Sequence, residues 1–159
     1  PPSRACDCVS AHCWLVTCLG VPVVFGINEH QISNTVRLVR RPKLRIAFSH
    51  GGGTLASLLP RLQQGWGVFP GLKETVLQAP SEQARKFYYD TLVFDRSTLR
   101  HLVDCFGSSQ LLVGTDYPFN FHDRTPVERI ESAGFDADVV ASLLYRNAEA
   151  FLGLKKEST

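Results

Sequence analysis

The sequence predicts an α/β fold in which short parallel strands alternate with helices. Three apolar stretches have the length and composition of buried strands, namely residues 44–48, 87–94 and 111–114. Each is followed by a stretch whose apolar residues fall at helical spacing. Strands that are covered on both faces read as near-continuous apolar runs, so this order is typical of a parallel sheet built from βα units.

A helix is predicted over residues 28–40, before the first strand. Asn28 can cap it, and Pro42 ends it because proline cannot donate the next helical hydrogen bond. The strand at residues 44–48 follows and runs into His50, which precedes three glycines.

The next helix is predicted to begin at Thr54 and to point four leucines inward: Leu55, Leu58, Leu59 and Leu62. Pro60 lies inside this helix, where its ring should kink or shorten it. Residues 65–80 contain two prolines and are predicted to form a long connection, of the kind that often shapes a substrate mouth.

A short helix is predicted from Ser81, and the second strand follows. Asp95 or Ser97 should then cap a helix that ends at Gly107. Its inward residues are Leu99, Leu102, Val103 and Phe106. Beyond the third strand, the pattern predicts a short helix over residues 126–133 and a longer one over 136–151 that ends at Gly153.

Two polar residues stand where predicted strands end. His50 follows the first strand and Asp116 follows the third. Catalytic groups collect at the carboxyl ends of parallel strands, so the two residues are expected to face one site. Histidine moves protons near neutral pH, and aspartate holds metals. Structural roles compete with these roles, because an isolated histidine is more often a hydrogen-bonded structural residue and the sequence TDYP suits a turn.

Four motifs occur in a fixed order: SHGGG, YYDTLVFD, LLVGTDYPF and NAEAFLGL. Together they resemble the C-terminal half of the aminocarboxymuconate-semialdehyde decarboxylase-like family of the amidohydrolase superfamily, from about Trp14 to Leu154. The resemblance implies the C-terminal part of a (β/α)8 TIM barrel of the metal-dependent hydrolase type. It also implies that residues 1–159 form one partial amidohydrolase-related domain, with residues 1–13 irregular.

The same resemblance implies a role for three residues. His50 matches the histidine of acid/base catalysis, and Asp116 matches an aspartate that binds zinc or another divalent metal. Arg61 falls where the family has an arginine that binds the substrate carboxylate of the neighbouring subunit. An arginine on a helix face is also commonly solvated, so the alternative is that Arg61 is a surface residue without a role in the site.

The activity implied by the resemblance is that of a metal-dependent non-oxidative decarboxylase, a carboxy-lyase, which acts on a small carboxylated substrate and is a homodimer in its full-length parent. A hydrolase of a C–N or C–O bond and a non-catalytic remnant remain as alternatives. The family's other metal ligands, an HxH pair and a further histidine, are expected before Pro1. A single aspartate cannot hold zinc usefully, so we expect an incomplete site and an inactive chain.

Composition sets further limits. A chain of 159 residues without methionine is too short for a whole barrel, so we expect a fragment of a longer protein. The net charge of +2 and the dispersed basic residues argue against a nucleic-acid partner. The apolar run at residues 14–27 is interrupted by glycine and proline and is too short to span a membrane.

The cysteines are expected to be reduced thiols of a cytoplasmic protein. Four of the five crowd the first 18 residues: Cys6, Cys8, Cys13 and Cys18. They lack paired CxxC spacing, so a structural zinc site there is not favoured. The HGGG motif could also form a lipase oxyanion hole or a phosphate loop, but the sequence lacks the GxSxG and GK[ST] motifs that these require.

Overall fold

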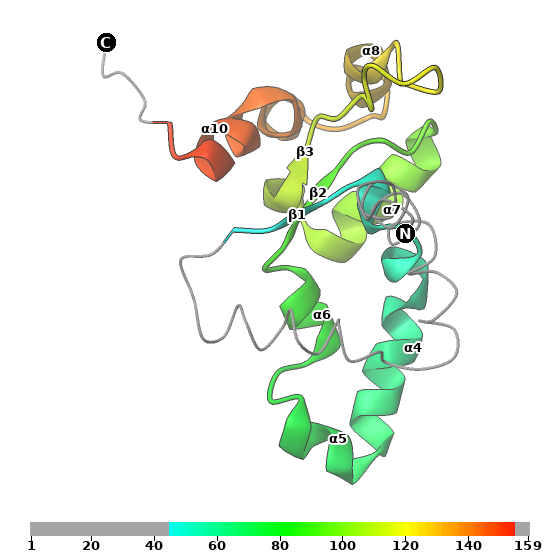
Figure 1. Cartoon of the computed structure of the whole chain (residues 1–159), viewed down its shortest axis with the longest axis vertical. Helices are drawn as coiled ribbons and strands as arrows, with labels where there is room; N and C mark the ends of the chain where they lie inside the picture. Colours follow the sequence, from blue (N-terminus) through cyan, green and yellow to red (C-terminus); the bar gives the residue numbers. More distant parts are fainter. Residues whose placement is uncertain (1–44, 155–159) are drawn as a thin grey trace, which may run out of the picture.

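The computed structural model describes residues 45–154 and contains a parallel three-stranded sheet with helices packed around it (Figure 1). The strands are β1 (Ala47–Phe48), β2 (Tyr88–Asp90) and β3 (Leu111–Leu112), and they lie in the order β1-β2-β3. All three had been predicted, although each is shorter than expected. The α/β class with parallel strands is therefore confirmed, while the assignment to the C-terminal part of a (β/α)8 barrel stays a prediction.

The helices lie between and after the strands. They are α4 (Leu55–Val68), α5 (Pro70–Thr75), α6 (Pro80–Ala84), α7 (Arg96–Phe106), α8 (Pro126–Glu131), α9 (Ala137–Ala141) and α10 (Asn147–Leu152). Three short helical segments complete the set: η1 (His50–Gly52), η2 (Ser108–Gln110) and the π-helical η3 (Ser142–Arg146). In Figure 1, α4, α6 and α7 lie on one side of the sheet and α10 lies on the other.

Alternation along β2 explains these two layers, because successive strand residues point to opposite faces. The ring of Tyr89 is fully buried and stacks on Phe106 of α7, with 3.8 Å between the ring centroids. The ring of the preceding residue, Tyr88, contacts the ring of Phe151 in α10 edge to face, with 5.0 Å between the ring centroids. Tyr89 also donates its hydroxyl to the carbonyl oxygen of Ala84, and burial raises the pKa of Tyr89 far above its ordinary value.

Helix α4 runs through Pro60 and has 14 residues, so the proline does not shorten it, and the alternative of a kink stays a prediction. Proline has no N–H to offer the carbonyl of Ala56, four residues earlier. The thiol of Cys105, on α7, donates to that carbonyl oxygen at 3.8 Å. A neighbouring helix therefore supplies the donor that the proline lacks.

The prediction of a long connection over residues 65–80 is wrong, because most of these residues are helical. Helix α4 extends to Val68, and Pro70 and Pro80 stand at the starts of α5 and α6. The first turn of a helix tolerates proline, since the missing N–H has no helical partner there. Trp66 donates its indole N–H to the carbonyl oxygen of Val76 at 2.8 Å, which fastens α5 back onto α4.

The helix of the second βα unit forms as predicted. Asp95 caps α7 by accepting from the backbone N–H of Thr98 at 2.7 Å, and Gly107 ends the helix at a φ of 93°. Of the four inward residues, Leu99, Leu102 and Phe106 are buried and Val103 is partly buried.

The last helix differs in one respect from the single helix expected over residues 136–151. The π-helical η3 interrupts it between α9 and α10, and Gly153 ends it in the left-handed conformation at a φ of 72°. The shorter helix before it, α8, begins at Pro126 as expected and ends at Glu131.

Several predictions fall outside the described residues: the helix at 28–40 and the states of Cys6, Cys8, Cys13 and Cys18. Within residues 45–154, none of the helices combines the length and the apolarity that crossing a membrane requires.

Candidate functional site

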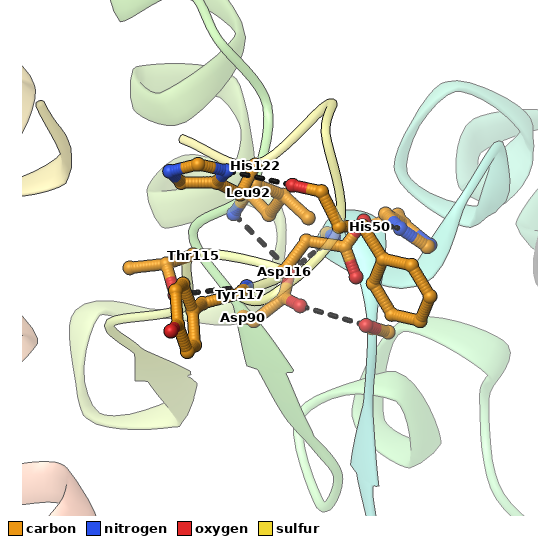
Figure 2. Close-up of polar contacts among 10 residues, drawn as sticks. His50, Asp90, Leu92, Thr115, Asp116, Tyr117 and His122 are labelled. Carbon is orange, nitrogen blue, oxygen red and sulfur yellow. Dashed lines mark hydrogen bonds and ion pairs between the residues drawn. The ribbon is translucent and has the colours of Figure 1, made fainter. Parts of the chain in front are cut away.

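Two polar side chains meet at the carboxyl edge of the sheet. Strand β1 leads through Ser49 to His50, and β3 leads through a short extended segment to Asp116. His50 Nε2 lies 3.7 Å from Asp116 Oδ2, and the two side chains are 31% and 27% exposed (Figure 2). The structure thus brings together the pair that the strand ends had suggested, in a position that solvent and a ligand can reach.

Both residues have an uncommon backbone conformation. The φ angle is 55° at His50 and 62° at Asp116, in the left-handed region that side chains other than glycine seldom adopt. Such conformations persist only where the surrounding structure enforces them, and they concentrate at functional sites. The shared conformation therefore supports a functional role for the pair.

Glycines allow the turn after His50 to pack closely against the core. Gly51 and Gly52 have φ angles of 59° and 75°. A Cβ atom on Gly51 would lie 2.7 Å from the side chain of Leu102, and one on Gly52 would lie 2.7 Å from the ring of Tyr89. The HGGG motif thus serves close packing and a left-handed backbone.

Asp90, the last residue of β2, is half-buried and bonded to both neighbours of His50. Its Oδ2 accepts from the Ser49 hydroxyl at 2.9 Å, and its Oδ1 accepts from the backbone N–H groups of Gly51 at 2.9 Å and Leu92 at 3.1 Å (Figure 2). The sequence singled out this residue as part of the motif YYDTLVFD. The connection to the His50 turn was missed, because it joins residues far apart in the chain.

The loop that carries Asp116 is fastened by a buried ion pair. Asp123 is 3% exposed and its carboxylate pairs with the guanidinium of Arg129. The backbone N–H of Asp123 donates to the carbonyl oxygen of Thr115, adjacent to Asp116, at 2.7 Å. Neither Asp123 nor Arg129 was predicted from the sequence, because their spacing of six residues offers no distinctive signal.

One nitrogen of the site has no partner in the part of the chain that the structure describes. His50 Nδ1 is buried and makes no hydrogen bond there, whereas Nε2 faces Asp116. A buried nitrogen without a hydrogen-bond partner costs free energy. His50 Nδ1 can therefore bind a group that the described residues do not supply.

Asp116 offers a carboxylate of the kind that binds divalent metals, but residues 45–154 contain no cluster of three or more potential metal ligands. Zinc in catalytic sites takes three protein ligands. The described residues therefore do not fit a metal by themselves, and any further ligands must come from elsewhere.

Arg61 is exposed on α4, and no ion pair links it to His50 or Asp116 among residues 45–154. Because Arg61 was predicted to act in the site of a neighbouring subunit, its role stays a prediction. Of the three predicted site residues, the described structure brings His50 and Asp116 together.

Comparison with known proteins gives consistent matches. Residues 14–154 match a protein family described as "Amidohydrolase". A 2-amino-3-carboxymuconate-6-semialdehyde decarboxylase from Dictyostelium discoideum is 38% identical over 117 residues, which cover 72% of this chain and 33% of that protein. The enzyme of the same name from Caenorhabditis elegans is 34% identical over 119 residues, covering 74% and 30%.

Among solved structures, the 5-carboxyvanillate decarboxylase from Sphingomonas paucimobilis superposes with a TM-score of 0.61 and 25% identity, over 75% of this chain and 36% of that one. The chain thus spans about a third of the length of the curated relatives that it matches.

Proposed function

Because this chain belongs to the amidohydrolase family and resembles its aminocarboxymuconate-semialdehyde decarboxylases, we propose that it carries the catalytic pair of a metal-dependent non-oxidative decarboxylase. The observation that carries the proposal is the approach of His50 Nε2 to Asp116 Oδ2, at 3.7 Å, across the carboxyl ends of parallel strands. The decarboxylase names of the relatives support the reaction class.

The proposed substrate is a small unsaturated or aromatic carboxylic acid. His50 donates a proton to the carbon atom that bears the carboxylate. The bond between that carbon and the carboxylate then breaks, carbon dioxide leaves, and the electron pair of the bond returns to the carbon skeleton. Solvent reprotonates His50, whose partly exposed side chain permits this step.

Asp116 is the proposed ligand of a divalent metal, with zinc as the first candidate. A divalent metal held there would supply a positive charge for polarising a substrate oxygen. Because the described residues do not complete a coordination sphere, the remaining ligands are proposed to come from outside residues 45–154.

Arg61 is the proposed substrate-binding residue, acting in the site of a second subunit of a homodimer. Its exposed position on α4 is consistent with this role. Its planar guanidinium matches both oxygens of a carboxylate. A cytoplasmic location remains part of the proposal and rests on the expected reduced cysteines.

A chimera tests the reaction. The segment of the Dictyostelium relative that matches this chain is replaced by the corresponding residues of this chain, and the purified protein is given carboxyl-¹³C-labelled 2-amino-3-carboxymuconate 6-semialdehyde. We expect labelled carbon dioxide and, in D₂O, deuterium at the vacated carbon. Cleavage of amide or lactone substrates without release of carbon dioxide would identify a hydrolase instead.

The 159-residue chain is assayed alone in parallel, with added Zn²⁺. We expect it neither to retain stoichiometric zinc nor to turn over the substrate, because the described ligand set is incomplete. Turnover by the isolated chain would contradict this expectation while leaving the reaction class intact.

A further inference from the structure

The carboxylate of Asp90 accepts hydrogen bonds from the residues directly before and directly after His50. Oδ2 accepts from the hydroxyl of Ser49, the residue before His50, and Oδ1 accepts from the N–H of Gly51, the residue after it, both at 2.9 Å. A third bond, from the N–H of Leu92 to Oδ1 at 3.1 Å, fixes the rotamer of Asp90 itself. The side chain of Asp90 is thus held on its own strand while it holds both flanks of His50.

The turn that carries His50 needs such support because φ is positive at four successive residues, with angles of 55° at His50, 59° at Gly51, 75° at Gly52 and 65° at Gly53. Within the turn, the N–H of Gly52 donates to Ser49 and the N–H of Gly53 donates to His50. Neither bond ties the turn to another strand. The bonds to Asp90 do so, and hydrogen bonds to an ionised group are stronger than those between neutral groups.

Asp90 also touches the strand that leads to Asp116. A Cβ atom placed on Gly114 would lie 2.8 Å from Cβ of Asp90, closer than real atoms approach, so the segment that follows β3 passes directly against this residue. Asp90 therefore lies between the turn that carries His50 and the strand end that carries Asp116.

We propose that Asp90 is a positioning residue that sets the direction of the His50 imidazole toward Asp116. The inference rests on the proposed function, in which His50 delivers the proton. Asp90 acts only through the backbone and side chain around His50, and it is assigned no contact with the substrate. The sequence motif YYDTLVFD is thereby connected to the site through its first aspartate, Asp90.

Two substitutions at Asp90 separate hydrogen bonding from charge. Asp90→Ala removes all three bonds. Asp90→Asn keeps an oxygen for Gly51 and Leu92 and places an NH₂ group that donates to the Ser49 oxygen. Asp95→Ala is the matched control, since Asp95 also accepts three bonds, from Ser97 and Thr98, but caps a helix.

The kinetic readout uses the decarboxylating protein. We expect Asp90→Ala to lower kcat by about 10- to 100-fold, the scale of a small misplacement of a catalytic group, with KM unchanged. Asp90→Asn and Asp95→Ala should retain kcat close to the parent value. An Asp90→Ala protein with parental kcat overturns the proposal, and so does an Asp90→Asn protein as slow as Asp90→Ala.

The structural readout uses crystal structures and amide hydrogen exchange of the 159-residue chain, and it decides the proposal even if the parent shows no decarboxylase activity. Asp90→Ala should lengthen the 3.7 Å distance from His50 Nε2 to Asp116 Oδ2 and deprotect the Gly51 amide, whereas Asp90→Asn should do neither. An unchanged distance in Asp90→Ala overturns the proposal.

If Asp90→Ala does not fold, Ser49→Ala replaces it, because it removes only the bond to Oδ2. It should displace His50 while leaving the Gly51 amide protected. If the distance from His50 Nε2 to Asp116 Oδ2 in Ser49→Ala equals that of the parent, the positioning role of Asp90 is overturned.

Discussion

His50 and Asp116 face each other across the carboxyl edge of the sheet, with Nε2 3.7 Å from Oδ2, and both have left-handed backbones. Substitution at either position therefore changes a side chain and, in most cases, a backbone preference as well. Asparagine is the non-glycine residue that best tolerates this conformation. Replacement by asparagine thus tests the chemistry of the pair while preserving its backbone.

His50→Asn should lower kcat of the decarboxylating chimera by about 100- to 10,000-fold, the usual contribution of a general acid or base. The melting temperature should stay close to that of the parent, since the side chain is partly exposed and the turn is kept. Kinetics and circular dichroism of the same preparation measure both quantities. Parental kcat in a folded His50→Asn protein would exclude the proton-transfer role.

Asp116→Asn should reduce metal retention by the chimera, because an amide oxygen is a weaker ligand than a carboxylate. Metal content after gel filtration, measured by atomic emission, is the readout. His50→Asn is the comparison and should retain the metal. Equal metal content in the parent and in Asp116→Asn would remove Asp116 from the ligand set.

Gly114→Ala should destabilise the chain by about 1–3 kcal/mol, the cost of overpacking, because the new Cβ atom would lie 2.8 Å from Cβ of Asp90. The matched control is Gly67→Ala, where a Cβ meets nothing within 4 Å. Urea unfolding monitored by tryptophan fluorescence compares the two variants. Equal urea midpoints would show that the backbone at Gly114 is not in close contact with Asp90.

Asp123→Ala should cost about 3–5 kcal/mol of unfolding free energy, because it leaves the guanidinium of Arg129 without its buried partner. The matched control breaks the ion pair between Arg146 and Asp138, whose side chains are 42% and 92% exposed. Exposed pairs contribute little, so Asp138→Ala should leave the urea midpoint unchanged. Similar losses in the two variants would argue against a special role for the buried pair.

The cap of α7 should make stability depend on pH at the acid end. Hydrogen bonds from Thr98 and then Ser97 hold the pKa of Asp95 well below its ordinary value of 3.8. A lowered folded-state pKa gives stability that is complete above the unfolded value and is lost as the pH falls through the folded value. Melting temperatures should therefore fall less steeply below pH 4 in Asp95→Asn than in the parent. If the melting temperatures of the parent and of Asp95→Asn fall equally with pH, the Asp95 cap does not contribute to the pH dependence of stability.

The order of strands and helices could be predicted because it depends on neighbours in the chain. Apolar runs marked the three strands, Asp95 or Ser97 marked a helix start, and Gly107 marked a helix end. Element lengths were predicted less well. Residues 65–80 became helical because Pro70 and Pro80 stand at helix starts, and α4 continued through Pro60 where Cys105 supplies a donor.

The sequence by itself determined that His50 and Asp116 end strands of one parallel sheet, and parallel strands place such ends at one edge. The tertiary structure alone decided how the pair is held: the left-handed backbones, the hydrogen bonds that Asp90 accepts from both flanks of His50, and the buried partner of Arg129. The reason is physical. Strand and helix preferences arise from nearby residues, whereas these contacts form between residues that come together only when the sheet and its helices pack.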